Sequence, residues 1–233
     1  MSTIALLRAE VLDANLDLVR HGLVVHAFGN ASAIDRDTGL VVIKPSGVPY
    51  EHLEAETLVV TDLDGRVIEG RYRPSSDLPT HLALYKAFPA VGAVVHTHSR
   101  YATIWAQAGR EVPCLGTTHA DYFRGDIPVT EPMTPAAIES AYEWNTGQMI
   151  VRRFSALDPL EMPAVLVHSH GPFCWAKSAR AAADLALTLE EVACMAWHTL
   201  ALNPSAKPIA AALRDKHFLR KHGPGAYYGQ GQG

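Results

Sequence analysis

The sequence predicts a single α/β domain whose sheet is at least partly antiparallel. The chain has 233 residues, 48% of them hydrophobic, which is enough to bury one large core. Helical patterns alternate with short runs rich in valine, isoleucine and leucine. Several connections between these runs are too short for the crossover helix that parallel strands require. We therefore expect antiparallel neighbours within one domain, residues 1–233.

The first half of the chain opens on a helix and continues with short apolar runs. Leu7, Val11, Ala14 and Leu18 recur at steps of four, three and four, which predicts an amphipathic helix that ends near Gly22. Turn-forming pairs such as Gly29-Asn30 separate the runs that follow. The predicted strands are Leu23–Phe28, Leu40–Lys44 and Leu58–Thr61.

The second half alternates helices with two further strands. A helix over Leu78–Phe88 has serine or aspartate as N-cap candidates and a proline in its first turn. Thr134-Pro135 opens another helix, which is apolar at Ile138, Ala141 and Tyr142. The remaining predicted helices are Tyr101–Ala108, Ser178–Leu202, which Asn203-Pro204 ends, and Pro208–His222.

Charge and cysteine content restrict the class of partner. The formal net charge of −4 provides no basic field for nucleic acid or an anionic membrane. Cys114, Cys174 and Cys194 are an odd number without a C-x-x-C pair, which suits a reducing cytosol. The amino-terminal segment is interrupted by charged residues, and we expect no membrane span there or elsewhere. We therefore expect a cytoplasmic protein in which histidine and carboxylate side chains would bind any metal.

Two apolar runs end in a His-x-His sequence. Val94 and Val95 lead into His96 and His98, and in a strand this spacing puts both imidazoles on one face. Alone, the pair is equally well read as two hydrogen-bonded structural histidines. A second run, 165–167, leads into His168 and His170. Two such strand ends favour a metal centre, although spacing leaves open which histidine of the second pair is a ligand.

Three short segments share features of a phosphate site. Gly29-Asn30, Lys44-Pro45-Ser46-Gly47 and Ser75-Ser76-Asp77 offer backbone N–H groups, hydroxyls, an amide and one lysine. Each alone is an ordinary turn. Asp77 is either an N-cap or a carboxylate ligand or proton carrier.

Three further candidates lie toward the carboxyl end. Asp121 lies among small and aromatic residues in 116–123, where desolvation would raise its pKa, unless it is a surface turn residue. Glu143 follows Glu139 at helical spacing and is typical of a solvated face. Tyr227-Tyr228 lie in a glycine-rich tail that composition alone predicts to be disordered. Together the residues predict a metal site that acts on a small phosphorylated compound.

Seven motifs together resemble the class II aldolase and adducin-head family, nearly end to end. The Gly-Asn-x-Ser and His-x-His pieces are shared across that family, whereas Thr-Thr-His-Ala-Asp-Tyr and Tyr-Tyr-Gly-Gln are typical of its sugar-phosphate epimerases. The motifs are 28–32, 43–47, 74–77, 96–99, 116–122, 168–172 and 216–223 with 227–230. The resemblance implies a three-layer α/β/α sandwich around a mainly antiparallel sheet.

The resemblance also implies roles for individual residues. Metal ligands would be Asp77, His96, His98 and His170, around Zn²⁺ or another divalent ion such as Mn²⁺. The substrate phosphate would be held by Gly29, Asn30, Ser46, Gly47, Ser75 and Ser76, with Lys44 nearby. Asp121 and Tyr228 would transfer protons, the tyrosine coming from a neighbouring subunit of a homotetramer. His217 and Glu143 are possible supports of this site.

The implied activity is a metal-dependent C4 epimerisation of L-ribulose 5-phosphate to D-xylulose 5-phosphate through retro-aldol cleavage, with a place in L-arabinose catabolism. One alternative is a sugar-phosphate aldolase of the same family, in which a glutamate stands at the position of Asp77. The other is a non-catalytic binding module like the adducin heads, which lack the metal ligands. Retention of the three histidines argues against the binding module.

Overall fold

A seven-stranded antiparallel sheet forms the middle layer of the molecule. A computed structural model describes residues 3–229. The strand order is β4-β3-β2-β1-β5-β7-β6, and every neighbouring pair is antiparallel. The strands are β1 Asn30–Asp35, β2 Leu40–Ile43, β3 Val59–Thr61, β4 Val67–Glu69, β5 Ala93–His96, β6 Ala164–Leu166 and β7 Pro172–Ala176.

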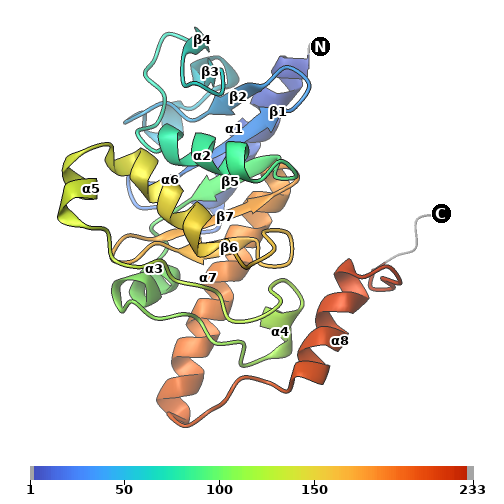
Figure 1. Cartoon of the computed structure of the whole chain (residues 1–233). Helices are drawn as coiled ribbons and strands as arrows, with labels where there is room; N and C mark the ends of the chain where they lie inside the picture. Colours follow the sequence, from blue (N-terminus) through green and yellow to red (C-terminus); the bar gives the residue numbers. More distant parts are fainter. Residues whose placement is uncertain (1–2, 230–233) are drawn as a thin grey trace.

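Helices cover both faces of the sheet, which confirms the three-layer α/β/α architecture (Figure 1). The helices α1 Thr3–Arg20 and α7 Ala179–Leu202 pack together on one face. The helices α2 Leu78–Ala87 and α6 Tyr142–Arg153 pack together on the other. The remaining helices are α3 Arg100–Gln107, α4 Thr117–Ala120, α5 Pro135–Glu139 and α8 Ala211–His222, with 3₁₀ turns η1 Tyr50–His52 and η2 Ala55–Thr57.

Burial on both faces explains the composition of the central strands. All residues of β5 are buried, as are the first five of β1 and the first four of β7. A strand that is covered on both sides has no solvent-facing positions, so β5 and β7 are largely apolar and do not alternate, whereas β1 includes the buried polar residues Asn30 and Ser32. For this reason valine-rich runs, and no alternating pattern, indicate β2, β5 and β6, whereas β1 carries no such run.

Several predicted helices are confirmed to within a few residues. The stripe of Val11, Ala14 and Leu18 is buried along α1. The Ser178 side chain caps α7 by accepting a hydrogen bond from the backbone N–H of Ala181. Helices α2, α3 and α8 also lie where the sequence predicts them. Helix α8 starts at Ala211, three residues later than expected.

The predicted strand Leu23–Phe28 is wrong. This segment is a turn in which His26 has φ 55° and the N–H of Phe28 bonds to the carbonyl of Val25. Leu23 is buried individually, while Val25 and Phe28 are exposed. The strand begins at Asn30, which the sequence assigned to a turn, because Asn30 pairs with His96 of β5.

The helix expected from Thr134 is two helices. Thr134 caps α5, but Ser140 leaves the helical region with φ −95° and ψ −118°. The Asn145 side chain donates to the carbonyl of Ala137 and to the Ser140 hydroxyl. These bonds satisfy groups at the end of α5, so the chain can restart as α6 at Tyr142.

The sequence predicts that no segment is apolar enough to cross a membrane, and helix α7 is an exception to this prediction. By length and composition alone, Ala179–Leu202 meets the requirement for a span. One face of α7, including Leu185, Leu189 and Val192, is instead buried in the core next to β5 and β7. A core helix of this kind meets the same requirement.

Candidate metal centre

One cavity gathers most of the predicted site residues at one end of the central strands. It has a volume of about 410 Å³ and opens beside the start of β1 and the ends of β2 and β5. Its lining is Ala27, Phe28, Gly29, Asn30, Lys44, Pro45, Ser46, Gly47, Ser75, Ser76, Asp77, His96, His98, Tyr142, Glu143 and His170. The predicted phosphate and metal residues therefore share one space.

His96 and His98 enter this cavity from the end of β5. His96 is the last residue of the strand and is 1% exposed, whereas His98 follows the strand and stacks on Phe28. Their Nε2 atoms are 3.1 Å apart. The i, i+2 spacing thus brings the two rings together although only His96 lies in the strand.

The second His-x-His sequence lies in the turn between β6 and β7, because β6 ends at Leu166. Its two rings separate: His170 lines the cavity, while His168 bonds to the Ser169 hydroxyl and lies beside Gly109. Ser169 has φ 60°, and this tight conformation separates the two histidines.

Gly171 allows this turn to approach the end of β5 closely. A Cβ atom at Gly171 would lie 2.7 Å from the carbonyl oxygen of Thr97 and 3.6 Å from ring carbons of both His96 and His98. Only a residue without a side chain fits this contact. Gly171 therefore brings the backbone that carries His170 against the backbone that carries the other two histidines.

The three imidazoles are suited to a divalent cation. One ring nitrogen from each of His96, His98 and His170 lies within 4.8 Å of the others. The His96 Nδ1 lies 2.9 Å from the carbonyl of Pro172, and donation there leaves the Nε2 lone pair free for a ligand bond. Burial lowers the pKa of His96 to about 3, and burial also lowers the pKa of His98 and of His170. The rings are therefore neutral at physiological pH, as metal ligation requires.

Asp77 occupies the N-cap position of α2 but makes no capping hydrogen bond with its side chain. Its Oδ2 instead accepts a 2.6 Å hydrogen bond from Asn30 Nδ2. Burial would raise the pKa of Asp77, but His96, His81 and the Asn30 hydrogen bond outweigh it and hold the pKa below its usual value. A carboxylate thus faces the cavity beside the neutral imidazoles.

Lys44 is a buried ammonium group whose described partners are carbonyl oxygens and the ring of Tyr50, whose centroid lies 4.8 Å from Nζ. The side chain is fully enclosed, and Nζ donates to the carbonyl of Val48 at 3.0 Å and more weakly to those of Ala27 and Pro45. Within residues 3–229 no carboxylate pairs with it, and burial lowers its pKa. A buried cation without a counter-ion is favourable for binding an anion.

The hydroxyl and amide groups around Lys44 are tied together. The N–H of Ser75 donates to the Lys44 carbonyl, and Asn30 Nδ2 donates to Ser75 Oγ at 3.1 Å. Asn30 Oδ1 is buried and has no hydrogen-bond partner among the described residues. Ser46, Gly47 and Ser76 are exposed at the mouth of the cavity. Donors, one free acceptor and a buried ammonium therefore line the same wall.

Two lining residues come from the first turn of α6. The Tyr142 hydroxyl oxygen lies 3.3 Å from Nδ1 of His170. The sequence predicts an apolar helix position for Tyr142 and no role in the site, because one tyrosine in a helix carries no spacing signal. Glu143 lines the cavity too, contrary to the solvated face that its helical spacing predicts.

Asp121 and Tyr228 do not line this cavity. Asp121 follows α4, and its carboxylate accepts two hydrogen bonds from Arg220 and one from His217. Tyr228 is 60% exposed, and its ring packs against Arg220 and Lys221. Both residues lie beside α8, which Figure 1 shows at the lower right of the molecule. The contacts around Asp121 also place His217 away from the imidazoles.

The expectation of a raised pKa for Asp121 is wrong. Burial does push the pKa upward, but the hydrogen bonds from Arg220 and His217 and the charge of Lys221 hold it below the usual value. The neighbouring sequence indicates that the Asp121 carboxylate is partly desolvated. It does not indicate the hydrogen-bond partners on α8, because they lie about 100 residues away along the chain.

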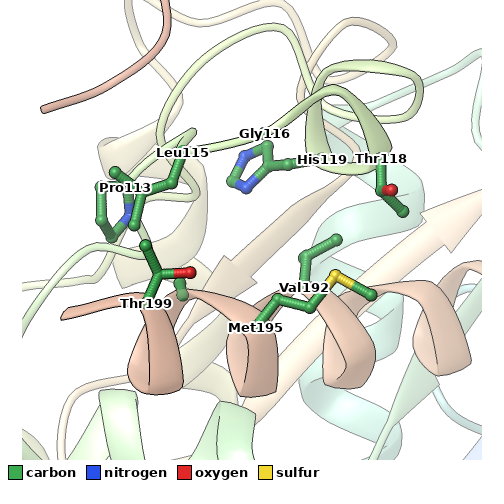
Figure 2. Close-up of a pocket in the computed structure, with 9 residues that line it drawn as sticks. Pro113, Leu115, Gly116, Thr118, His119, Val192, Met195 and Thr199 are labelled. Carbon is green, nitrogen blue, oxygen red and sulfur yellow. The ribbon is translucent and has the colours of Figure 1, made fainter. Parts of the chain in front are cut away.

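A second cavity, of about 230 Å³, lies between the α4 segment and α7 (Figure 2). His119 faces Val192, Met195 and Thr199 of α7 across it. Burial lowers the pKa of His119 to about 4, and its Nε2 lies 2.7 Å from the carbonyl of Gly125. This cavity contains none of the predicted metal or phosphate residues, although its rim belongs to the motif that includes Asp121.

Comparison with known proteins places the chain in a family. Residues 9–197 match the class II aldolase and adducin N-terminal domain. The L-ribulose-5-phosphate 4-epimerase UlaF of Salmonella paratyphi B is 56% identical over 224 residues, 96% of this chain and 98% of the relative. A solved L-fuculose 1-phosphate aldolase superposes with a TM-score of 0.76 at 25% identity, covering 93% of this chain and 95% of its own. The L-fuculose-1-phosphate aldolase of Thermus thermophilus has a TM-score of 0.68 at 25% identity and covers 87% of this chain and 100% of its own. The chain belongs to the class II aldolase and adducin family.

Proposed function

We propose that this chain is a metal-dependent epimerase that interconverts L-ribulose 5-phosphate and D-xylulose 5-phosphate at C4. The observation that carries the proposal is the convergence of three neutral imidazoles on one cavity that also holds Asp77 and the buried Lys44. Relatives named as L-ribulose-5-phosphate 4-epimerases support the choice of substrate. We also propose that residues 1–233 act as one domain, in the cytoplasm and in carbohydrate metabolism, with L-arabinose catabolism as one setting.

His96, His98 and His170 would hold the divalent cation, with Asp77 as a fourth ligand or a close counter-charge. Three imidazoles and a carboxylate suit zinc, and manganese is the alternative. When bound, such an ion supplies Lewis acidity to the substrate oxygens at C2 and C3. The side chains contribute neutral nitrogen donors that need no deprotonation at physiological pH.

The substrate phosphate would be bound between Lys44 and the segments 29–30, 46–47 and 75–76. Lys44 supplies the buried positive charge, and the loops supply backbone N–H groups and hydroxyls. The free Oδ1 of Asn30 would accept a hydrogen bond from a substrate hydroxyl. Holding the phosphate would keep the glycolaldehyde phosphate fragment from leaving while its aldehyde group turns.

The reaction would proceed by retro-aldol cleavage, since the C4 hydrogen is not adjacent to the C2 carbonyl and is difficult to remove. One base takes the C4 hydroxyl proton, the C3–C4 bond breaks, and glycolaldehyde phosphate and the enediolate of dihydroxyacetone remain. The aldehyde turns over, the bond forms again on its other face, and an acid returns a proton to the C4 oxygen. Because that oxygen points to opposite sides before and after, two proton carriers are needed.

Asp121 and Tyr228 would be these two carriers, supplied to each cavity by another copy of the chain in a homotetramer. Within the described residues both lie beside α8 and outside the cavity, which favours delivery from a neighbouring subunit. Exposed apolar side chains on α3 and α7, including Ile104, Met195 and Trp197, support association of copies. A nearby copy would also replace the solvent at the exposed Tyr228 ring.

A class II sugar-phosphate aldolase is the second candidate, because two similar solved structures at 25% identity are named L-fuculose 1-phosphate aldolases. An aldolase would release the two fragments that an epimerase rejoins. The resemblance associates a glutamate with the Asp77 position in aldolases, so aspartate at this position favours the epimerase.

Product analysis tests the proposal. The purified protein is incubated with L-ribulose 5-phosphate, with zinc or manganese and with a chelator, and the sugar phosphates are identified. We expect D-xylulose 5-phosphate only in the presence of metal. Accumulation of dihydroxyacetone and glycolaldehyde phosphate would identify an aldolase, and no turnover with either ion would contradict both enzymes and favour a binding module.

A further inference from the structure

Tyr142 is the one tyrosine that both lines the metal cavity and contacts a predicted ligand, among the residues that the structure describes. Its hydroxyl oxygen lies 3.3 Å from Nδ1 of His170, and the two rings are tilted by 34° with their centres 6.1 Å apart. The hydroxyl is therefore at the edge of the imidazole, where it meets the ring nitrogen.

A neutral histidine can bind a metal through only one nitrogen, and the other then carries a proton. Which nitrogen is protonated depends on the hydrogen bond that it makes. The structure contains this arrangement at His96, whose Nδ1 lies 2.9 Å from the carbonyl of Pro172. At His170 the Tyr142 hydroxyl is the group in the corresponding place.

The position of Tyr142 is itself fixed by the packing of α6 on α2. Thr80 of α2 donates from its hydroxyl to the carbonyl of Glu143 at 2.6 Å, and Thr146 donates to the carbonyl of Tyr142 at 2.9 Å. One turn later, Gly147 lies against Ala83 with no room for a side chain. The first turn of α6 is thereby tied to the helix that begins just after Asp77.

We infer that Tyr142 is a positioning residue: its hydroxyl oxygen accepts a hydrogen bond from Nδ1–H of His170, keeps the lone pair on Nε2, and so sets the affinity of this centre for a divalent cation. This inference rests on the metal centre of the proposed function. Outer partners of metal-bound histidines typically contribute about 10- to 100-fold in metal affinity. Tyr142 needs no contact with substrate to have this effect.

The Tyr142→Phe variant tests the inference, because it removes the hydroxyl and keeps the ring. Tyr50→Phe is the matched control, because it also removes a tyrosine hydrogen bond beside the cavity, the buried one to the carbonyl of Gly29. The Tyr50 hydroxyl donates to that carbonyl and to none of the three histidines. Zinc affinity is measured by competition with a chelating indicator. The protonated nitrogen of His170 is identified in the metal-free protein by long-range ¹H–¹⁵N NMR.

We expect Tyr142→Phe to bind zinc about 10- to 100-fold more weakly than the wild type, and Tyr50→Phe to bind it as the wild type does. Wild-type His170 should carry its proton on Nδ1, and the variant should show a mixture of both tautomers. A proton on Nε2 in the wild type would overturn the inference, and this measurement needs no variant.

Equal zinc affinity in Tyr142→Phe and the wild type would also overturn it, while leaving the proposed function intact. A wild-type protein that binds no divalent metal would overturn both. Equal weakening in Tyr142→Phe and Tyr50→Phe would show a general loss of packing and would contradict the specific role.

Discussion

His81 is a fully buried histidine beneath the metal cavity. Its Nδ1 lies 2.7 Å from Ser32 Oγ, which in turn lies 2.7 Å from the Tyr85 hydroxyl, and the ring packs edge-on against Phe173. Burial lowers the pKa of His81 to about 4, and the nearby charge of Asp77 only partly opposes this. The folded protein therefore keeps His81 neutral over a range in which an unfolded chain would protonate it.

This difference predicts a loss of stability in acid. Between pH 6.5 and about 4 the unfolded chain binds a proton at His81 and the folded protein does not, so the free energy of unfolding falls as the pH falls through this window. This one group lowers the free energy of unfolding by about 3 kcal/mol. The loss is complete once the pH lies below the pKa of His81 in the folded protein. Denaturant unfolding of the metal-free protein at several pH values measures it.

The variant His81→Asn isolates the effect, because asparagine keeps a polar atom near Ser32 and does not titrate. We expect its free energy of unfolding to depend less steeply on pH in this window than that of the wild type. The exposed His52→Asn should retain the wild-type slope. Parallel pH profiles for His81→Asn and the wild type would show that His81 does not carry the dependence.

Variants of Asp121 and of the metal ligands are expected to lose turnover in two distinguishable ways. Asp121→Asn removes a proton carrier and should lower turnover of L-ribulose 5-phosphate by ~10²–10⁴, with the metal content unchanged. His96→Asn should abolish turnover through loss of the metal itself. Elemental analysis of the purified variants, together with the product assay, separates the two. Loss of metal in Asp121→Asn would contradict the role proposed for this residue.

At the scale of elements, the contact between α2 and α6 relates Asp77 to Tyr142. A Cβ atom at Gly147 would lie 2.5 Å from Cβ of Ala83 and 3.2 Å from the backbone of Thr80. The two helices therefore pack closer than side chains at this point would permit. Their separation determines how far the start of α6 lies from the start of α2.

Gly147→Ala should force these helices apart and cost about 1–3 kcal/mol in the free energy of unfolding, in addition to weakening metal binding. The double variant Gly147→Ala with Ala83→Gly removes the Cβ atom of the facing helix that the new Cβ would meet, and so makes room for it. We expect it to be more stable than the sum of the two single changes implies, in a double-mutant cycle measured by denaturant unfolding. Strict additivity would mean that the helices do not meet at these residues.

The sequence predicts much of the element order because most elements carry local signals. The stripe of α1 and the Ser178 cap of α7 are such signals. The sequence misplaced β1, because Asn30 pairs with His96 through contacts that span 66 residues. It also predicts one helix from Thr134 through Tyr142, because helical periodicity does not indicate the Asn145 side-chain hydrogen bonds that lie at the break.

In the candidate site, local sequence patterns do not indicate residues whose role depends on neighbours that are distant along the chain. The paired His-x-His sequences indicate a metal centre, and the resemblance selects His170 over His168, the choice that the cavity lining agrees with. No pattern indicates Tyr142, which lines the cavity and contacts His170 from 28 residues away along the chain. The low pKa of Asp121 likewise depends on α8.

At the scale of the whole molecule, the described chain contains two separated parts of one proposed reaction. The metal and phosphate residues line the cavity at the end of the central strands, while Asp121 and Tyr228 lie together beside α8. The proposed reaction therefore requires that the two parts meet between copies of the chain. Neither part is expected to catalyse epimerisation without the other.

Subunit mixing tests this requirement most directly. His96→Asn carries an intact acid–base part and a damaged metal part, and Tyr228→Phe carries the reverse. Differently tagged copies of the two are co-expressed, and assemblies that contain both are purified and assayed with L-ribulose 5-phosphate and zinc. We predict that the mixed assemblies form D-xylulose 5-phosphate faster than either parent, because His96 from one chain meets Tyr228 from another. Verified mixed assemblies that are no more active than the parents would contradict a site shared between subunits.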